Sequence, residues 1–242
     1  MTTLGIVRQA AGACLFGMAL HAHAASLQIS PVILNLNGAE RATSMTLRNE
    51  GAEPIYGQVR VYAWRQTTTE DVLQETSALV ASPPMIQIAP GATQVVRLLQ
   101  PEPASRPGES SYRLIIDEIA PPDPMRATGV QVRLRYSVPV FVGAAPQSPA
   151  QRHLAWSLVR DGSDWALRVD NSGTHRAQLS DVALVVNGKS RSLRDGLLGY
   201  VLGGSARQWP LPFQPAAQGA VSVKARVNSV PVQADVRTDT GK

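Results

Sequence analysis

Apolar and polar residues alternate along most of the chain with a period of two. The pattern is clearest in five segments, at residues 43–49, 55–64, 93–99, 112–118 and 130–136. A period of two places every second side chain on the same face of an extended chain, so each segment predicts a β-strand with one buried face. Clusters of Pro, Gly, Asn and Asp separate the segments and predict turns.

Short strands that follow one another at regular spacing are typical of a β-sandwich rather than of a parallel sheet. The one segment that could form a short helix is 71–77. A second series of strand patterns covers residues 153–160, 165–170, 177–186, 220–227 and 230–236. Asn187-Gly188 follows the third of these and predicts a hairpin turn.

The two strand series imply two domains. The segment between them, residues 144–152, lacks periodicity and contains Pro146 and Pro149, as expected of a linker. We therefore predict an N-terminal domain at 26–143 and a C-terminal β-sandwich domain at 153–242. Both have an ordinary domain size.

Residues 1–25 resemble a cleaved secretory signal. Arg8 is their only charge, an apolar run covers 10–20, and small residues follow up to Ala25. The run is too short to span a bilayer. Cys14 raises the alternative of a lipoprotein, but the residues around it do not fit a lipidation site. Because Cys14 is the only cysteine, the processed chain has no disulfide and must rely on its core.

Charge and motifs exclude several classes of function. Loss of Arg8 lowers the formal net charge from +5 to about +4, and the remaining basic residues are dispersed, so nucleic-acid binding is not indicated. No catalytic, cofactor or metal motif is present. Asp117 and Glu118 are neighbours on a predicted strand and face opposite ways, so they do not form an acid/base pair. We expect neither an enzyme nor a small-molecule substrate.

One strand carries an apolar row that has two interpretations. Val130, Val132 and Leu134 lie on one face, and polar or basic residues alternate with them. The row belongs either to a half-buried sandwich strand with a solvated basic face or to a strand that is offered to another protein.

An ordered set of motifs resembles a known family. The motifs are Ser82-Pro-Pro84, Ile88-Ala-Pro-Gly91, Val95-Val-Arg-Leu98, Ser111 to Ile119, Arg135 to Phe141 and Gly199-Tyr-Val-Leu202. Together they resemble the PapD-like periplasmic chaperones of pilus assembly. The blocks at 111–119 and 135–141 are most similar to the archaic branch, which serves spore-coat-U-like pilins.

The resemblance implies a fold and partners. The fold would be all-β, with two immunoglobulin-like β-sandwich domains in a boomerang arrangement. The protein would act in the periplasm, bind and cap pilus subunits by donor-strand complementation, and deliver them to an outer-membrane usher. The donated side chains would be those of Val130, Val132 and Leu134.

The resemblance also implies two basic residues that anchor the carboxylate of the pilin C-terminus, but the sequence departs from the family here. The usual lysine falls on Pro139, and the usual arginine falls near Ser30-Pro31. Arg113 and Arg135 are the candidates by position, because a guanidinium binds a carboxylate with two parallel hydrogen bonds. Arg133 is the next alternative. Both candidates could instead be ordinary surface arginines on polar strand faces.

A second surface implied by the resemblance would face the usher. Its residues would be Tyr56, Gln58, Pro83, Pro84, Arg97 and Ile119. The competing interpretation is that Pro83-Pro84 is a rigid turn, with a cis bond at Pro84, and that Arg97 is a solvated strand residue.

A structural protein is the alternative to a chaperone. Two immunoglobulin-like modules could form an adhesin or a pilus component. A pilin would carry an N-terminal extension for donation, whereas here a strand pattern begins almost at once at Ser26. This feature favours the chaperone.

Overall fold

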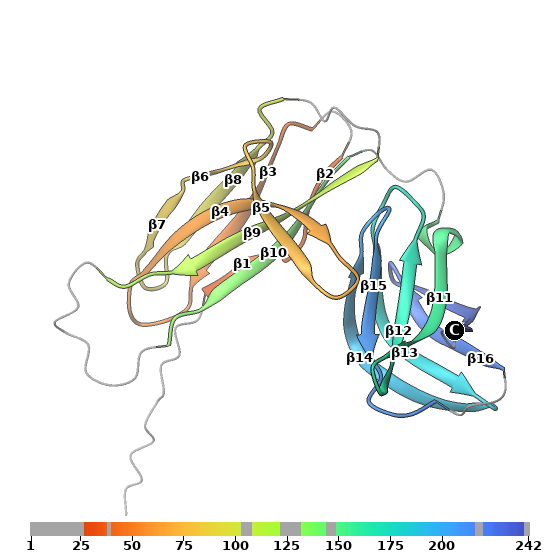
Figure 1. Ribbon diagram of the computed structural model, residues 1–242. Coiled ribbons are helices and arrows are strands. Elements are labelled where there is room, and N and C mark those ends of the chain that lie inside the picture. Colours follow the sequence, from red (N-terminus) through yellow and green to blue (C-terminus); the bar gives the residue numbers. More distant parts are fainter. Residues whose placement is uncertain are drawn as a thin grey trace, which may run out of the picture.

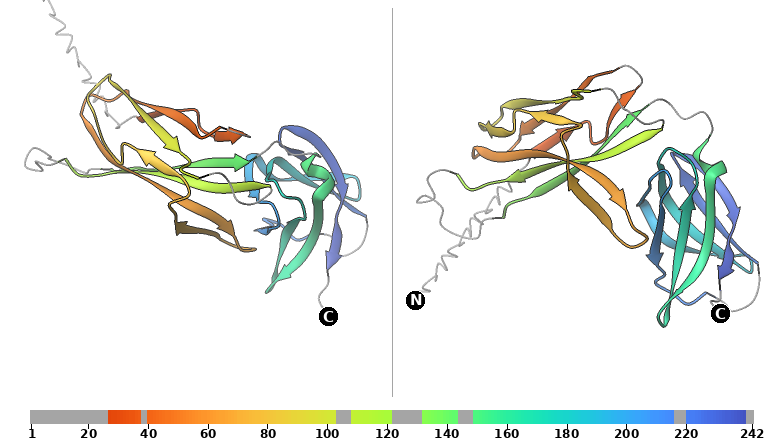
Figure 2. Two further views of the ribbon diagram at one scale, coloured as in Figure 1. Left: turned by 90° about the horizontal axis from the view of Figure 1, so that it is seen from above. Right: turned by 45° about the horizontal axis from the view of Figure 1, so that its top comes forward.

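The computed structural model describes residues 27–37, 40–102, 108–121, 132–143, 149–215 and 220–239. These residues form two β-sandwiches set at an angle to each other (Figures 1 and 2). The predicted all-β, two-sandwich fold is confirmed. In the described ranges, no helix is long and apolar enough to cross a membrane.

The N-terminal sandwich consists of two sheets that face each other across one core. One sheet has the order β1-β3-β8-β6 and the other the order β2-β10-β9-β4-β5, with β7 also paired to β4. The strands are β1 (Leu27–Ser30), β2 (Leu34–Asn37), β3 (Ala42–Asn49), β4 (Ile55–Gln66), β5 (Asp71–Glu75), β6 (Val80–Ser82), β7 (Met85–Ile88), β8 (Thr93–Leu99), β9 (Glu109–Glu118) and β10 (Arg135–Gly143).

The alternation seen in the sequence builds this core. In β8, Val96 and Leu98 are fully buried, whereas the intervening Arg97 is exposed. Leu114 and Ile116 of β9 complete the same cluster from the opposite sheet. Burial of such residues, each worth about 1.5–3 kcal/mol, stabilises a chain that has no disulfide in its described part.

The C-terminal sandwich has sheets of order β15-β12-β11-β18 and β14-β13-β16-β17. Its elements are the 3-10 helix η2 (Ala150–His153) and the strands β11 (Leu154–Asp161), β12 (Asp164–Asn171), β13 (Ala177–Val186), β14 (Lys189–Val201), β15 (Ala206–Pro210), β16 (Val221–Val227), β17 (Val230–Asp235) and β18 (Arg237–Asp239). The predicted hairpin turn is confirmed between β13 and β14, where Asn187 and Gly188 have φ values of 50° and 76°. Positive φ at both positions is the requirement that Asn-Gly meets.

Two local predictions differ from the structure. The helical candidate at 71–77 is wrong, because Asp71–Glu75 is strand β5 and pairs along the end of β4. The hydrogen-bonding edge of β4 decides the conformation of this short segment, which no local pattern sets. The predicted strand at 130–136 begins later, since β10 starts at Arg135. Val130 lies outside the described residues.

A small apolar cluster joins the two sandwiches. Trp64 and Phe141 from the first pack against Tyr200 and Leu202 from the second. The rings of Trp64 and Tyr200 meet edge to face, with centroids 5.6 Å apart, a favourable arrangement for aromatic pairs. This cluster forms the floor from which an interdomain cleft opens.

Polar contacts reinforce the junction on both sides of the cluster. The Gln66 side chain donates to the carbonyl of Tyr200 at 3.0 Å and accepts from the N–H of Leu202 at 2.9 Å. On the other side, Arg176 donates to the carboxylate of Glu109 and lies over the Phe141 ring, 3.6 Å from its centroid. These contacts set the relative position of the domains.

Candidate functional site

Part of strand β10 has an open edge. Its register with β9 covers Arg135–Gly143, whereas β2 pairs only with the section from Val140 onward. Among the described strands, none pairs with this second edge over Arg135–Pro139. The N–H of Glu118 donates to the carbonyl of Leu134 at 3.0 Å, so even-numbered residues bond to β9 and odd-numbered residues point their main-chain groups at the open edge.

Pro139 fits this geometry. As an odd-numbered residue, Pro139 points its main-chain nitrogen at the open edge. An N–H at this position would have no ladder partner, so proline costs no hydrogen bond here. Proline is confined to such positions within sheets. The open edge therefore offers both main-chain groups of Arg135 and Ser137.

An exposed apolar row leads into this edge. Val132 is 69% exposed and Leu134 is 40% exposed. Their side chains lie on the same face of the strand as those of Tyr136 and Val138, which pack in the core of the first sandwich. The row thus extends the inner face of the sheet beyond the core, and the structure exposes the two described residues of the predicted donor strand.

Glu118 holds the start of this row in place. Its carboxylate accepts from the N–H of Leu134 and from the hydroxyl of Tyr136, both at 3.2 Å. Burial and the neighbouring Glu118 raise the pKa of Tyr136 to about 12, so its hydroxyl stays protonated as a donor at neutral pH. The row is therefore positioned by β9.

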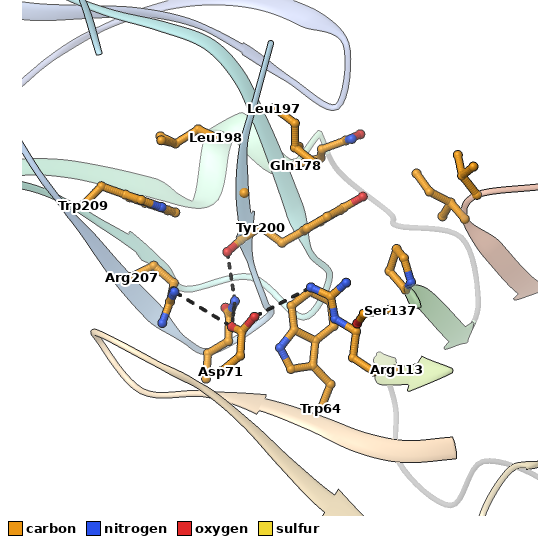
Figure 3. A pocket seen from close by; sticks show the side chains of 15 residues that line it. Trp64, Asp71, Arg113, Ser137, Gln178, Leu197, Leu198, Tyr200, Arg207 and Trp209 are labelled. Atoms are coloured by element: carbon orange, nitrogen blue, oxygen red, sulfur yellow. Dashed lines mark hydrogen bonds and ion pairs between the residues drawn. The ribbon is translucent and has the colours of Figure 1, made fainter. Parts of the chain in front are cut away.

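The cleft between the sandwiches has a volume of about 440 Å³ and is lined by both domains. Figure 3 shows Trp64, Asp71 and Arg113 on one side and Tyr200, Arg207 and Trp209 on the other. Ser137 and Pro139 of β10 also line it. The open edge of β10 therefore leads directly into the cleft.

Arg113 lies at the base of this cleft. Its guanidinium carbon lies 3.7 Å from the centroid of the Trp64 ring, and one of its nitrogens lies 3.7 Å from Asp71. Only 16% of its side chain is exposed. Burial lowers the pKa of Arg113, and the charge of Asp71 partly offsets this effect. Arginine still remains charged, so the cleft holds a poorly hydrated cation.

Arg113 also lies beside the position that the resemblance assigns to the family's usual lysine. In the register it is directly opposite Pro139, the position on which that lysine falls.

The structure does not bring Arg135 into the cleft. Arg135 pairs with Asp117 across β9, and its Nε donates to that carboxylate. It lies four residues before Pro139, or about 13 Å along the strand. Its side chain is 68% exposed. Arg133, the alternative, is exposed as well.

Sequence reasoning missed a second arginine in the cleft. Arg207 reaches it from β15 of the C-terminal sandwich, with 14% of its side chain exposed and one nitrogen 4.0 Å from Asp71. Its Nε is buried and, within the described ranges, has no hydrogen-bond partner. The short pattern of β15 carries no sign of this role, because its place depends on how the domains pack.

Asp117 should make stability depend on acid pH. Burial opposes its charge, but hydrogen bonds from Arg135 and Arg60 prevail and lower the pKa of Asp117. A lowered pKa contributes stability above the unfolded value, near pH 4, which is lost as pH falls through the folded value. We expect the free energy of unfolding to fall as the pH drops below about 4, and to fall less steeply in Asp117→Asn. Denaturant titrations at a series of pH values measure this free energy. The same pH dependence in the wild type and in Asp117→Asn would contradict the prediction.

The proposed usher-facing residues gather at one corner of the N-terminal sandwich. Ile119 donates its N–H to the carbonyl of Tyr56, and Gln58 pairs with β7. The carbonyl of Pro84 accepts from Val59. Arg97 is paired with Ser82, the residue before Pro83. All six side chains are exposed or half-buried. The cis bond precedes Pro83, not Pro84 as predicted.

No candidate metal site emerges from the described residues. They contain no group of three or more His, Cys, Asp or Glu side chains that could hold an ion. The cleft instead offers two guanidinium groups, aromatic faces and one carboxylate. This chemistry suits recognition of an anionic group.

Comparison with solved structures reveals the same two-domain architecture. One match is the chaperone–tip adhesion subunit complex CsuC–CsuE from archaic chaperone-usher pili of Acinetobacter baumannii, at 25% identity over 89% of this chain and 100% of that chain, with a TM-score of 0.69. The YadV chaperone matches at 18% identity over 86% and 98%, with a TM-score of 0.65. The Salmonella enterica SafA pilin–SafB chaperone complex matches at 15% identity over 87% and 94%, with a TM-score of 0.59.

The sequence comparisons address the family directly. No curated protein sequence matches significantly. The family model for the pili and flagellar-assembly chaperone, PapD N-terminal domain, matches residues 26–148, just over half of the chain. The predicted resemblance is therefore confirmed, and so is the prediction of a non-enzymatic protein, because the family consists of chaperones. The chain belongs to the PapD-like pilus-assembly chaperones.

Proposed function

We propose that the protein binds and caps pilus subunits in the periplasm by donating the strand that leads into β10. The observation that carries this proposal is the conjunction of an open strand edge with an exposed apolar row, Val132 and Leu134, that extends the core face. A subunit that lacks one strand has an unpaired edge and an uncovered groove, both of which promote aggregation. The donated strand covers both.

The energetics favour such a pairing. Main-chain groups at the open edge of β10 form the ladder and set its register, while apolar side chains fill the groove. At about 25 cal/mol per Å² of apolar area, three buried side chains supply several kcal/mol. Val130, the third predicted donor, precedes the two described ones.

Arg113 would anchor the carboxylate at the end of the subunit chain. The side chain is desolvated and braced against Trp64, so little conformational freedom is lost when a carboxylate binds. Arg135 has a different position, at the start of β10 and paired with Asp117. Its contribution would be to orient the donated strand.

Delivery to an outer-membrane usher forms the last part of the proposal. In the strand order, β9 separates β10 from β4, which carries Tyr56, and the open edge is on the opposite side of β10. An usher could therefore dock at the corner around Tyr56 while a subunit remains bound. The similarity to CsuC–CsuE supports an archaic-type pilus as the destination.

Co-expression with a pilus subunit from the same genome tests the function. We expect a 1:1 complex from the periplasm and no chaperone in assembled fibres, whereas a structural pilus protein would appear in the fibres. Recovery of the subunit without the chaperone, or of fibres that contain it, would overturn the proposal.

The anchor requires a separate test. Arg113→Ala should weaken subunit capture at least tenfold, since a charge-assisted bond to a buried carboxylate contributes roughly 1.5–3 kcal/mol. Removal of the last residue of the subunit should harm wild type similarly but add little in the variant. Arg48→Ala, which removes an exposed arginine on β3, is the matched control. If Arg113→Ala and removal of the last subunit residue have additive effects on capture, the subunit carboxylate does not bind at Arg113.

A further inference from the structure

Two consecutive carboxylates at the end of β9 reach the same short stretch of chain from opposite faces of the sheet. Side chains alternate along a strand, so Asp117 lies on the outer face and Glu118 on the inner face. Asp117 accepts from the Nε of Arg135, the residue with which it is paired. Glu118 accepts from the N–H of Leu134 and from the hydroxyl of Tyr136. The two acids therefore hold three successive residues at the point where the exposed apolar row enters β10.

The contact on the inner face restrains the main chain of the row. The N–H of Glu118 donates to the carbonyl of Leu134 at 3.0 Å, and the N–H of Leu134 donates to the carboxylate of Glu118 at 3.2 Å. Both main-chain groups of Leu134 are thus bonded to a single residue of β9. Leu134 is 40% exposed, whereas Val138 farther along β10 is 4% exposed. Hydrogen bonds therefore contribute more than burial to holding Leu134 in place.

The end of β9 that carries the two acids is itself tied to β4. Ile119, the next residue, donates its N–H to the carbonyl of Tyr56 at 2.9 Å. Arg60 of β4 donates to Asp117 at 2.6 Å, and the Asp117 side chain is only 15% exposed. The restraint on the row therefore comes from the body of the sheet, as required of residues that position a binding element.

We propose that Asp117 and Glu118 are positioning residues that hold the donated strand ready before a subunit arrives and thereby set the rate of subunit capture. A strand that samples many conformations is competent for pairing only part of the time, and its apparent affinity falls by the competent fraction. Fixing the main chain of one residue changes such a population by roughly a factor of ten. Because a bound subunit would hold the same strand through its own ladder bonds, the two acids act on association and not on release. The inference rests on the proposed function, since only a donated strand needs to be held ready.

The kinetics of capture test this role. A denatured pilus subunit from the same genome is diluted into the chaperone, capture is followed by stopped-flow fluorescence, and release is measured by exchange with an excess of tagged chaperone. Glu118→Ala should slow capture about tenfold and leave release unchanged. Asp117→Ala should slow capture about two- to fivefold, because Arg135 is 68% exposed and exposed ion pairs are weak. Glu50→Ala, which removes an exposed ion pair with Arg48, is the matched control and should capture at the wild-type rate.

Hydrogen exchange in the free chaperone separates positioning from direct contact with the subunit. The amide of Leu134 should exchange about tenfold faster in Glu118→Ala than in wild type. The amide of Val138, which lies within the paired part of β10, should be unchanged. Glu118→Gln keeps an oxygen acceptor, so it should recover most of the protection and of the capture rate. If Glu118→Ala also exposes Val138, the sandwich itself is damaged, and Asp117→Ala then decides: capture at the wild-type rate in that variant would overturn the proposal.

The possible outcomes distinguish this inference from the proposed function. If Glu118→Ala captures the subunit at the wild-type rate although Leu134 has lost its protection, the inference fails and the chaperone function stands. If release accelerates in Glu118→Ala, Glu118 contacts the subunit directly and the positioning role fails. If the exchange results are as expected but wild type captures no subunit, the restraint on the strand stands and the proposed function fails.

Discussion

Replacing Val132 with Glu should abolish capture of a pilus subunit and leave the free chaperone folded. Val132 is 69% exposed and precedes the first residue of β10, so a charge there is solvated in the free protein. In the complex, the same carboxylate would enter an apolar groove, where an unpaired charge costs several kcal/mol. Each 1.4 kcal/mol is a tenfold loss of affinity.

Co-purification of the subunit measures this effect. Val230→Glu is the matched control, because Val230 is 48% exposed and lies in the other sandwich. The control should capture the subunit normally. Capture by Val132→Glu at the control level would show that the donated strand lies elsewhere. Unfolding of the free variant would show that Val132 belongs to a core.

Replacing Phe141 with Ala should uncouple the two sandwiches. Phe141 is 2% exposed, lies 5.6 Å from the ring of Tyr200 and supports the guanidinium of Arg176. Truncation of a buried Phe costs about 3–5 kcal/mol. The two large cores do not include Phe141. We therefore expect the wild type to unfold in one transition and the variant to unfold in two, since each sandwich retains its own core.

Calorimetry and denaturant titration measure this change. Phe141→Leu keeps most of the apolar volume and should cost about 1–2 kcal/mol with a single transition. Subunit capture should fall in Phe141→Ala, because the arginines of the cleft come from both domains. A single transition in Phe141→Ala would mean that the polar contacts at Gln66 and Glu109 suffice to couple the domains.

The strand patterns of the sequence determine the faces of the sheets. Because side chains alternate along a strand, the period-two segments at 112–118 and 130–136 place Leu114 and Ile116 inside and Arg113 and Arg135 outside. The Asn-Gly turn is equally local. Both features follow from the steric properties of a few consecutive residues, which is why they could be predicted.

The register and pairing of strands, unlike the strand faces and the turn, depend on segments that are distant in the sequence. The sequence places Arg113 and Arg135 on one outer face, but only the pairing of β9 with β10 puts Pro139, and not Arg135, opposite Arg113. The short segment Asp71–Glu75 becomes a strand because the end of β4 offers an edge. No local pattern contains this information.

The exposed apolar row of Val132 and Leu134 is intermediate between features set by local sequence and features set by strand pairing. Its alternation is visible in the sequence, but a buried strand and a donated strand have the same pattern. Exposure of Val132 and Leu134 arises because the opposing sheet does not cover this end of the row, whereas it buries Val138. Only the packing of the sheets distinguishes the two interpretations.

The sequence by itself determined the two β-sandwiches and the family resemblance, because these depend on local alternation and on motifs in order. The tertiary structure decided the composition of the cleft. Arg207 and Arg113 are far apart in the sequence and lie on separate domains, and they meet at Asp71 only because Trp64, Phe141 and Tyr200 pack together at the junction. Contacts between domains depend on the shapes of both packed surfaces, which alternation along a single strand does not specify.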